Sequence, residues 1–336
     1  MKKLLAVALA GVLAGCQSAG VKINSEADIS ANTKLEVVNR EAMKDGKNIE
    51  LPSNYDVKAF NKLRIVAYVD RIDFEKDALS TEIDNSIIAK LLENELDRTK
   101  RFEVLTRNCP SCDYEIAYQA ENTVAEGSAK VSEQLNPDFI LESSISLGTT
   151  VKKKSDHNEL IFRSLITTKI VDPSTRKIIH SFAPIRENMD PKRFFAFDGK
   201  FLGGFDYRKA NELQEAYKEV AEKGIQLLVN QVMNYYPVGG RVTDYISGHF
   251  VIDAGIDQGF AVKQPVVLVL DGLDIPVASA EVTPKANGGS GNIWSWKKGD
   301  PVAEQTKKML EAMGKEYLQR NKIYAVSVGA PEDWKR

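Results

Sequence analysis

The sequence is poor in the residues that most often carry out chemistry, with three cysteines and three histidines among 336 residues. His157, His180 and His249 fall in separate segments, and no two of them have the spacing of metal ligands. Neither a glycine-rich phosphate loop nor a nucleophile elbow is present. The sequence therefore contains no signal of an enzyme, and we expect no catalytic residues, no metal and no cofactor.

The charge balance and the lack of long apolar runs exclude two further classes of protein. The net charge is −2 and the pI about 6.1, so no excess of positive charge would attract nucleic acid, and we expect no such partner. After the first twenty residues no apolar run reaches the roughly 18 residues that indicate a transmembrane helix. The hydrophobic fraction of 43% and the charged fraction of 27% are typical of globular domains.

The first residues have the pattern of an export signal. Lys2 and Lys3 precede an apolar run over residues 4–13, which is shorter than the roughly 20 residues of a permanent membrane helix. Leu13-Ala14-Gly15-Cys16 then resembles the lipobox of bacterial lipoproteins. The alternative is an ordinary secretory signal followed by an incidental cysteine.

The lipobox resemblance implies that residues 1–15 are a signal peptide and that Cys16 carries acyl chains such as palmitate. Several acyl chains together would hold the mature protein stably on a membrane. Gln17 follows the cysteine, where an aspartate would favour retention at the inner membrane. We therefore expect an outer-membrane lipoprotein on the periplasmic side, with residues 16–56, which are polar and show little periodicity, as a flexible tether.

Hydrophobic periodicity predicts an α/β domain over residues 57–236. Its predicted strands are Leu63–Val69, Phe102–Leu105, Phe139–Val151, Leu160–Val171 and Ile178–Phe182. Its predicted helices are Ser80–Arg98, capped by Ser80 or Thr81, then a polar helix Thr123–Gln134, and a long helix Ala210–Asn234.

A different pattern begins at Tyr236-Pro237, where proline ends the long helix. Residues 237–336 contain short strands separated by glycine turns, and a helix is predicted over residues 303–320 before a last strand at 323–328. We expect a small β-barrel with this helix near its end. The glycine-rich run Asn287–Asn292 is predicted to be a mobile tip. Trp294 and Trp296 alternate, so one of them could face the core and the other a partner.

The order of several motifs resembles a known periplasmic family. The motifs are Val66-Ala67-Tyr68-Val69, Lys100–Arg107, Asn136–Ser143 and Ile170–Ile179. Their order is similar to that in the domain shared by the curli secretion lipoprotein (CsgG-like), the lipoprotein activators of penicillin-binding proteins and the flagellar ring protein FlgT. The barrel, with Gly240-Arg241-Val242, Gly255–Phe260 and Gly299-Asp300-Pro301, resembles the carboxy-terminal domain of FlgT.

This resemblance implies an α+β fold, with a CsgG-like α/β sandwich followed by the barrel. It also implies a scaffold for assembly or secretion of an envelope structure, such as a curli-like fibre or a flagellar ring, acting as a homo-oligomer or with envelope-assembly proteins. The alternative is a regulator that docks on a peptidoglycan synthase. The curli protein builds a channel from long hairpins, but the turn around Lys152 is short and charged, and its strands have a single apolar face. We therefore expect no self-made channel.

Two further features are candidate sites. Cys109 and Cys112 could form a structural disulfide, as the oxidising periplasm favours, although a redox or metal role stays open. The stretch Pro191–Tyr207 is predicted to be a loop, either folded back on its own sheet or forming a partner surface. Its aromatic residues are Phe194, Phe195, Phe197, Phe201, Phe205 and Tyr207.

Overall fold

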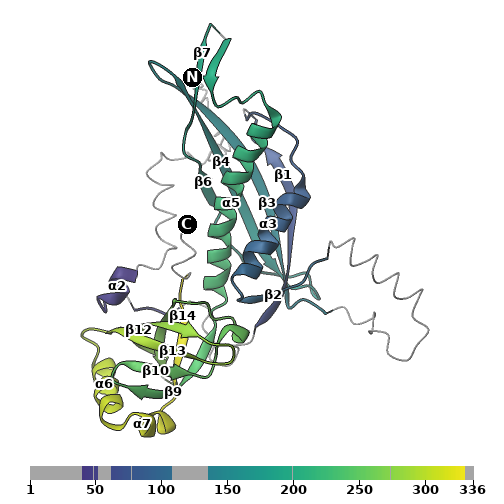
Figure 1. Cartoon of the computed structure of the whole chain (residues 1–336). Helices are drawn as coiled ribbons and strands as arrows, with labels where there is room; N and C mark the ends of the chain where they lie inside the picture. The colour runs from purple at the N-terminus through teal and green to yellow at the C-terminus, as the bar shows by residue number, and fades with distance from the viewer. Residues whose placement is uncertain are drawn as a thin grey trace, which may run out of the picture.

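The computed structural model describes residues 40–47, 49–51, 62–76, 78–107, 135–198, 200–272 and 274–329. It consists of one mixed sheet with helices against it, followed by a closed barrel, which confirms the predicted α+β class (Figure 1). Cys16, Cys109, Cys112 and the predicted helix Thr123–Gln134 lie outside the described residues. Within the described ranges no helix is long and apolar enough to cross a membrane.

The sheet of the first domain is organised around two long strands, β3 and β4, which form an antiparallel hairpin. The strand order is β2-β1-β3-β4-β7-β8, and β5 and β6 also pair with β4. β1 runs parallel to both β2 and β3. The strands are β1 Leu63–Phe74, β2 Phe102–Val104, β3 Phe139–Lys153, β4 Asn158–Val171, β5 Ile178–Ser181, β6 Ile185–Asn188, β7 Lys192–Phe197 and β8 Lys200–Gly204.

Two helices, α3 (Asn85–Arg98) and α5 (Ala210–Tyr235), pack on the sheet and on each other (Figure 1). Alternate residues of β3 and β4, such as Leu141 and Phe162, are fully buried with them, as expected for a sheet covered on one face. The predicted start of α3 at Ser80 is wrong. The helix begins at Asn85 because the Asp84 side chain accepts a hydrogen bond from Ser86 N, 2.8 Å away, and caps it.

The second domain is a closed barrel with the strand order β10-β13-β12-β11-β14-β9. Two predictions for this domain are wrong. The expected mobile tip at Asn287–Asn292 mostly belongs to β13, because Gly289–Asn292 pair with both β10 and β12. The expected single helix is broken at Gly314, whose φ of 48° and ψ of −118° no helix contains.

The barrel strands are β9 Gly239–Ile246, β10 His249–Ile252, β11 Gln264–Leu270, β12 Ile275–Pro284, β13 Gly289–Trp296 and β14 Ile323–Ser327. The helices are the 3-10 turn η1 Ile256–Gln258, α6 Pro301–Met313 and α7 Lys315–Arg320.

Part of the expected flexible tether is folded onto the barrel, which corrects that prediction for residues 40–51. α2 (Arg40–Lys44) contacts β12 and β13, and Ser279 Oγ donates to the carbonyl oxygen of Met43 across 2.6 Å. Met43 and Ile49 are buried against Val267 and Val326. Trp294 packs in this cluster with Lys44 Nζ 5.6 Å from its ring, whereas Trp296 packs on the barrel core. One tryptophan thus faces the barrel core, and the other faces the chain's own amino-terminal segment.

Arg101 joins the two domains. Its side chain is fully buried, and its guanidinium donates to the carbonyl oxygens of Tyr236 at 3.0 Å and Gly259 at 3.0 Å. It also donates to Ser327 Oγ at 3.0 Å and Gln264 Oε1 at 3.3 Å. Among the described residues no carboxylate forms an ion pair with it. Burial lowers its pKa to about 9, so it remains charged at neutral pH and must be satisfied by these oxygens.

Candidate functional site: the hairpin end

The predicted loop Pro191–Tyr207 is instead mostly a β-hairpin of β7 and β8, which corrects the sequence interpretation. β7 pairs with the start of β4, so this hairpin lies beside the β3–β4 turn. Gly204 makes the return to α5 possible, because its φ is 88° and a Cβ there would collide with the Arg193 carbonyl oxygen. Figure 1 shows β7 at the end of the first domain that lies farthest from the barrel.

Four of the six candidate aromatic residues pack within their own domain. Phe194 is buried with its ring centroid 5.2 Å from that of Tyr207, and Phe205 lies 5.6 Å from Phe162. Phe201 is half-buried against the core, with the Arg208 guanidinium carbon 4.6 Å from its ring. For these four residues, the first alternative holds, in which the segment folds back on its own sheet.

The remaining two aromatic residues are exposed to solvent. Phe195 is 41% and Phe197 69% exposed, and they occupy alternate positions of β7, so they share a face. Two further residues near the same tip are exposed, although the sequence did not single them out: Leu202 on β8 is 68% exposed, and Val151 near the end of β3 is 51% exposed. We call residues 151–159, 193–198 and 200–202 together the hairpin end.

The hairpin end is also basic. Without counting His157, it contains five exposed lysine and arginine side chains and three carboxylates. The cations are Lys152, Lys153, Lys154, Arg193 and Lys200, and the carboxylates are Asp156, Glu159 and Asp198. The protein as a whole is slightly acidic, so this end has the opposite sign of charge.

A histidine organises the β3–β4 turn. His157 Nδ1 lies 2.7 Å from Asp156 Oδ1, and its Nε2 lies 3.4 Å from Glu159 Oε1. The hydrogen bond with His157 lowers the pKa of the Asp156 carboxyl, which therefore stays ionised. The His157 ring is 6.0 Å from that of Phe195, so the two hairpins touch at this position.

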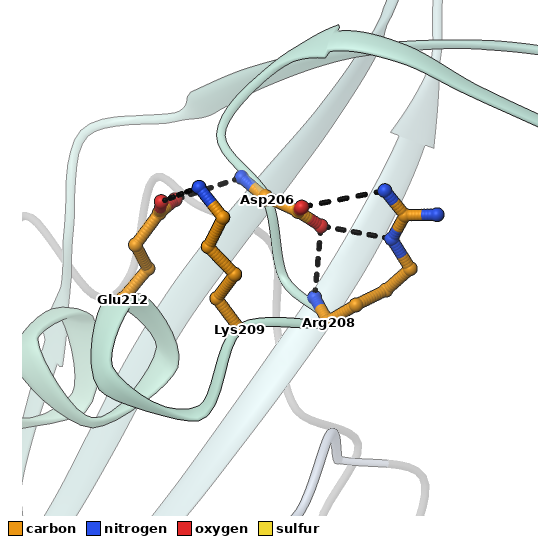
Figure 2. Close-up of polar contacts among 4 residues, drawn as sticks. All are labelled: Asp206, Arg208, Lys209 and Glu212. Carbon is orange, nitrogen blue, oxygen red and sulfur yellow. Dashed lines mark hydrogen bonds and ion pairs between the residues drawn. The ribbon is translucent and has the colours of Figure 1, made fainter.

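A polar cluster at the start of α5 holds the base of the hairpin (Figure 2). The Asp206 carboxylate accepts bonds from Arg208 N at 3.2 Å and Nε at 2.9 Å. Glu212 accepts from Asp206 N at 2.9 Å and Lys209 Nζ at 3.0 Å. The hydrogen bond from the Arg208 side chain lowers the pKa of Asp206, and the one from the Asp206 backbone lowers that of Glu212. The cluster thus fixes where the hairpin joins the helix.

A groove of about 570 Å³ lies between the amino-terminal turns of α3 and α5. Ile87, 45% exposed, contributes an apolar side chain to it. Three exposed carboxylates and one lysine line its rim: Glu82, Asp84, Glu215 and Lys218. Gln214 Nε2 donates to the carbonyl oxygen of Glu82 across 2.7 Å and ties α5 to the segment that leads into α3. The groove is therefore both apolar and acidic.

The other sequence candidates are not brought together. His180 stacks on Tyr235, with centroids 4.2 Å apart, and His249 lies on the barrel. Over the ranges that the structure describes, no group of three His, Cys, Asp or Glu side chains could hold a metal ion. Arg101 and the groove were missed, because no local sequence pattern marks either of them.

No family model and no curated protein matches this chain. Membership of the curli, penicillin-binding-protein activator or FlgT families therefore stays a prediction.

Several solved structures resemble part of the chain. A protein described as a homologue of a neuraminyllactose-binding haemagglutinin, from Helicobacter pylori, is 14% identical with a TM-score of 0.29, over 56% of this chain and 95% of that one. The PelC dodecamer from Paraburkholderia phytofirmans is 12% identical with a TM-score of 0.24, over 51% and 88%. Lipoprotein GNA1162 from Neisseria meningitidis is 12% identical with a TM-score of 0.23, over 51% and 99%. Similarity at this level does not establish a shared function.

Proposed function

We propose that this chain is a lipid-anchored protein of the bacterial cell envelope, held at the outer membrane on its periplasmic side. It acts without enzymatic activity as a scaffold in the assembly or secretion of an envelope structure, such as a curli-like fibre or a flagellar ring. The lipobox ending at Cys16 supports the anchor. The family resemblance of the sequence motifs supports the kind of structure assembled.

The observation that carries the scaffold function is the exposed apolar hairpin end. Phe197 and Leu202 are each more than two-thirds exposed on the same hairpin. Monomeric soluble proteins rarely leave large apolar side chains grouped in this way, and such groups mark contact sites. A scaffold needs a contact surface of this kind and needs no reactive group.

The anchor is tested by metabolic labelling with a fatty acid. We expect the parent chain to incorporate the label and Cys16→Ala to incorporate none. Equal incorporation by the two chains would contradict the lipid anchor.

The scaffold function is tested in cells whose own copy of the protein is replaced by variants. We expect Phe195→Ser/Phe197→Ser to remain folded and lipidated but to lose surface fibres or flagella in electron micrographs. Ile246→Ser is the matched control, because Ile246 is 68% exposed but lies on the barrel. Normal fibres and flagella in the hairpin variant would refute the scaffold function. Altered peptidoglycan synthesis in their place would support the regulatory alternative.

A further inference from the structure

The hairpin end has a shape that a flat partner surface could not cover. Val151 pairs directly with Leu160, and Leu160 pairs with Lys192, so these three residues share one face of the sheet. Phe195 and Phe197 stand at odd intervals from Lys192 along β7 and therefore point to the other face. Exposed apolar side chains thus lie on both faces of the tip. A groove that receives the tip would cover both faces.

The groove between α3 and α5 has the matching chemistry. It exposes Ile87 to an incoming apolar side chain, and its rim carries three carboxylates against one lysine. The hydrogen bond from Ser86 lowers the pKa of the Asp84 carboxyl, so this carboxylate is ionised at neutral pH. The groove lining therefore has a net negative charge, whereas the hairpin end has a net positive one.

We propose that the hairpin end of one copy of this chain docks in the α3–α5 groove of a second copy. Phe197 and Leu202 enter beside Ile87, and Lys153 and Lys200 face Glu82 and Glu215. Complementary charge fixes the orientation and speeds association, while the buried aromatic side chain supplies much of the affinity. Because the two surfaces differ, two copies that make the contact twice form a two-fold pair. A contact repeated head to tail forms a ring where it closes and an open filament where it does not.

The inference deepens the proposed scaffold function by naming the partner of its contact surface. The test uses charge reversal in the full lipidated chain, kept in detergent and followed by analytical ultracentrifugation. One variant is Lys153→Glu/Lys200→Glu, in which the hairpin end becomes acidic like the groove. The other is Glu82→Lys/Glu215→Lys, in which the groove becomes basic like the hairpin end.

We expect the parent chain to self-associate and each reversed variant alone to dissociate, with a dissociation constant raised by about 100-fold. An equal mixture of the two variants should associate again, because each hairpin then meets a groove of opposite charge. The matched control Lys307→Glu/Lys308→Glu reverses two lysines of α6 on the barrel and should associate like the parent. Circular dichroism checks that every variant is folded.

A parent chain that remains monomeric, or a mixture that stays dissociated, would overturn the proposal. Binding of the hairpin end to the bilayer would also overturn the proposal. It is tested with brominated lipid in phosphatidylethanolamine–phosphatidylglycerol vesicles. Such binding would quench the tryptophan fluorescence added by Phe197→Trp but not the fluorescence added by Ile246→Trp. The two proposals are tested by different measurements. Normal fibres or flagella in cells with Phe195→Ser/Phe197→Ser would refute the scaffold function. The mixing experiment with purified chains would still report whether the hairpin end docks in the groove.

Discussion

The guanidinium Nη2 of Arg101 lies 3.3 Å from Oε1 of Gln264, and this contact joins the first domain to the barrel. Gln264 is itself fully buried, and its amide donates to the carbonyl oxygen of Gly329 across 2.9 Å. A buried cation with only neutral acceptors is costly unless every donor is satisfied. The donors of Arg101 are satisfied by acceptors from both domains, Tyr236 in the first and Gly259 in the barrel.

Arg101→Met should lower the free energy of unfolding by about 2 kcal/mol or more, because the buried oxygens of Tyr236, Gly259 and Gln264 lose their donor. Urea denaturation measures the change. Arg71→Met is the matched control, since the Arg71 side chain is 68% exposed and its partner Asp73 is 48% exposed, so this ion pair should contribute less than about 1 kcal/mol. Equal losses in both variants would show that the junction does not depend on Arg101.

Truncation of a buried and of an exposed aromatic residue of the hairpin should change the stability of the protein by very different amounts. Phe194→Ser should destabilise the protein by about 3 kcal/mol or more, because Phe194 is buried against Tyr207. Phe197→Ser should change stability by less than about 0.5 kcal/mol, since Phe197 is exposed. Thermal unfolding of the two variants measures the difference. A large loss for Phe197→Ser would mean that it belongs to the core.

The segment 40–51 should detach from the barrel when Met43 is replaced by Ser. This change removes most of an apolar side chain that is 2% exposed in the cluster with Ile49 and Val267. We expect faster amide hydrogen exchange in residues 40–51 and unchanged exchange in the barrel strands. Glu41→Ala provides the control, because the Glu41 side chain is 84% exposed. Unchanged protection of the segment in Met43→Ser would contradict this docking.

Asp172 should titrate well below an ordinary aspartate. Its carboxylate accepts hydrogen bonds from Ser174 Oγ at 2.6 Å and Thr175 N at 2.9 Å, which lower its pKa from 3.8 to about 2. Because the folded pKa lies below the unfolded one, the stabilising effect is complete above pH about 4 and is lost as the pH falls towards about 2. A carboxyl NMR titration gives the pKa directly. Asp172→Asn should lack this acid-dependent loss, and an ordinary midpoint near 4 would refute the prediction.

The sequence by itself determined the local elements with strong periodicity. The alternation in Phe139–Val151 and Leu160–Val171 predicted β3 and β4, and the apolar stripe that includes Leu213, Tyr217 and Leu228 predicted α5. Pro237 and the following glycines predicted the change from helix to barrel strands. These features depend on the conformational preferences of residues close together in the sequence, and the spacing of apolar residues shows those preferences directly.

Only the tertiary structure decided which aromatic residues of Pro191–Tyr207 are covered. Phe194 and Phe197 have the same side chain, but they point to opposite faces of β7 and only Phe194 is buried. The tertiary structure also decided that Met43 packs on the barrel and that Arg101 links residues 158 and 226 positions away in the chain, Gly259 and Ser327. Such contacts depend on how distant elements close around a core, and no local pattern encodes that closure.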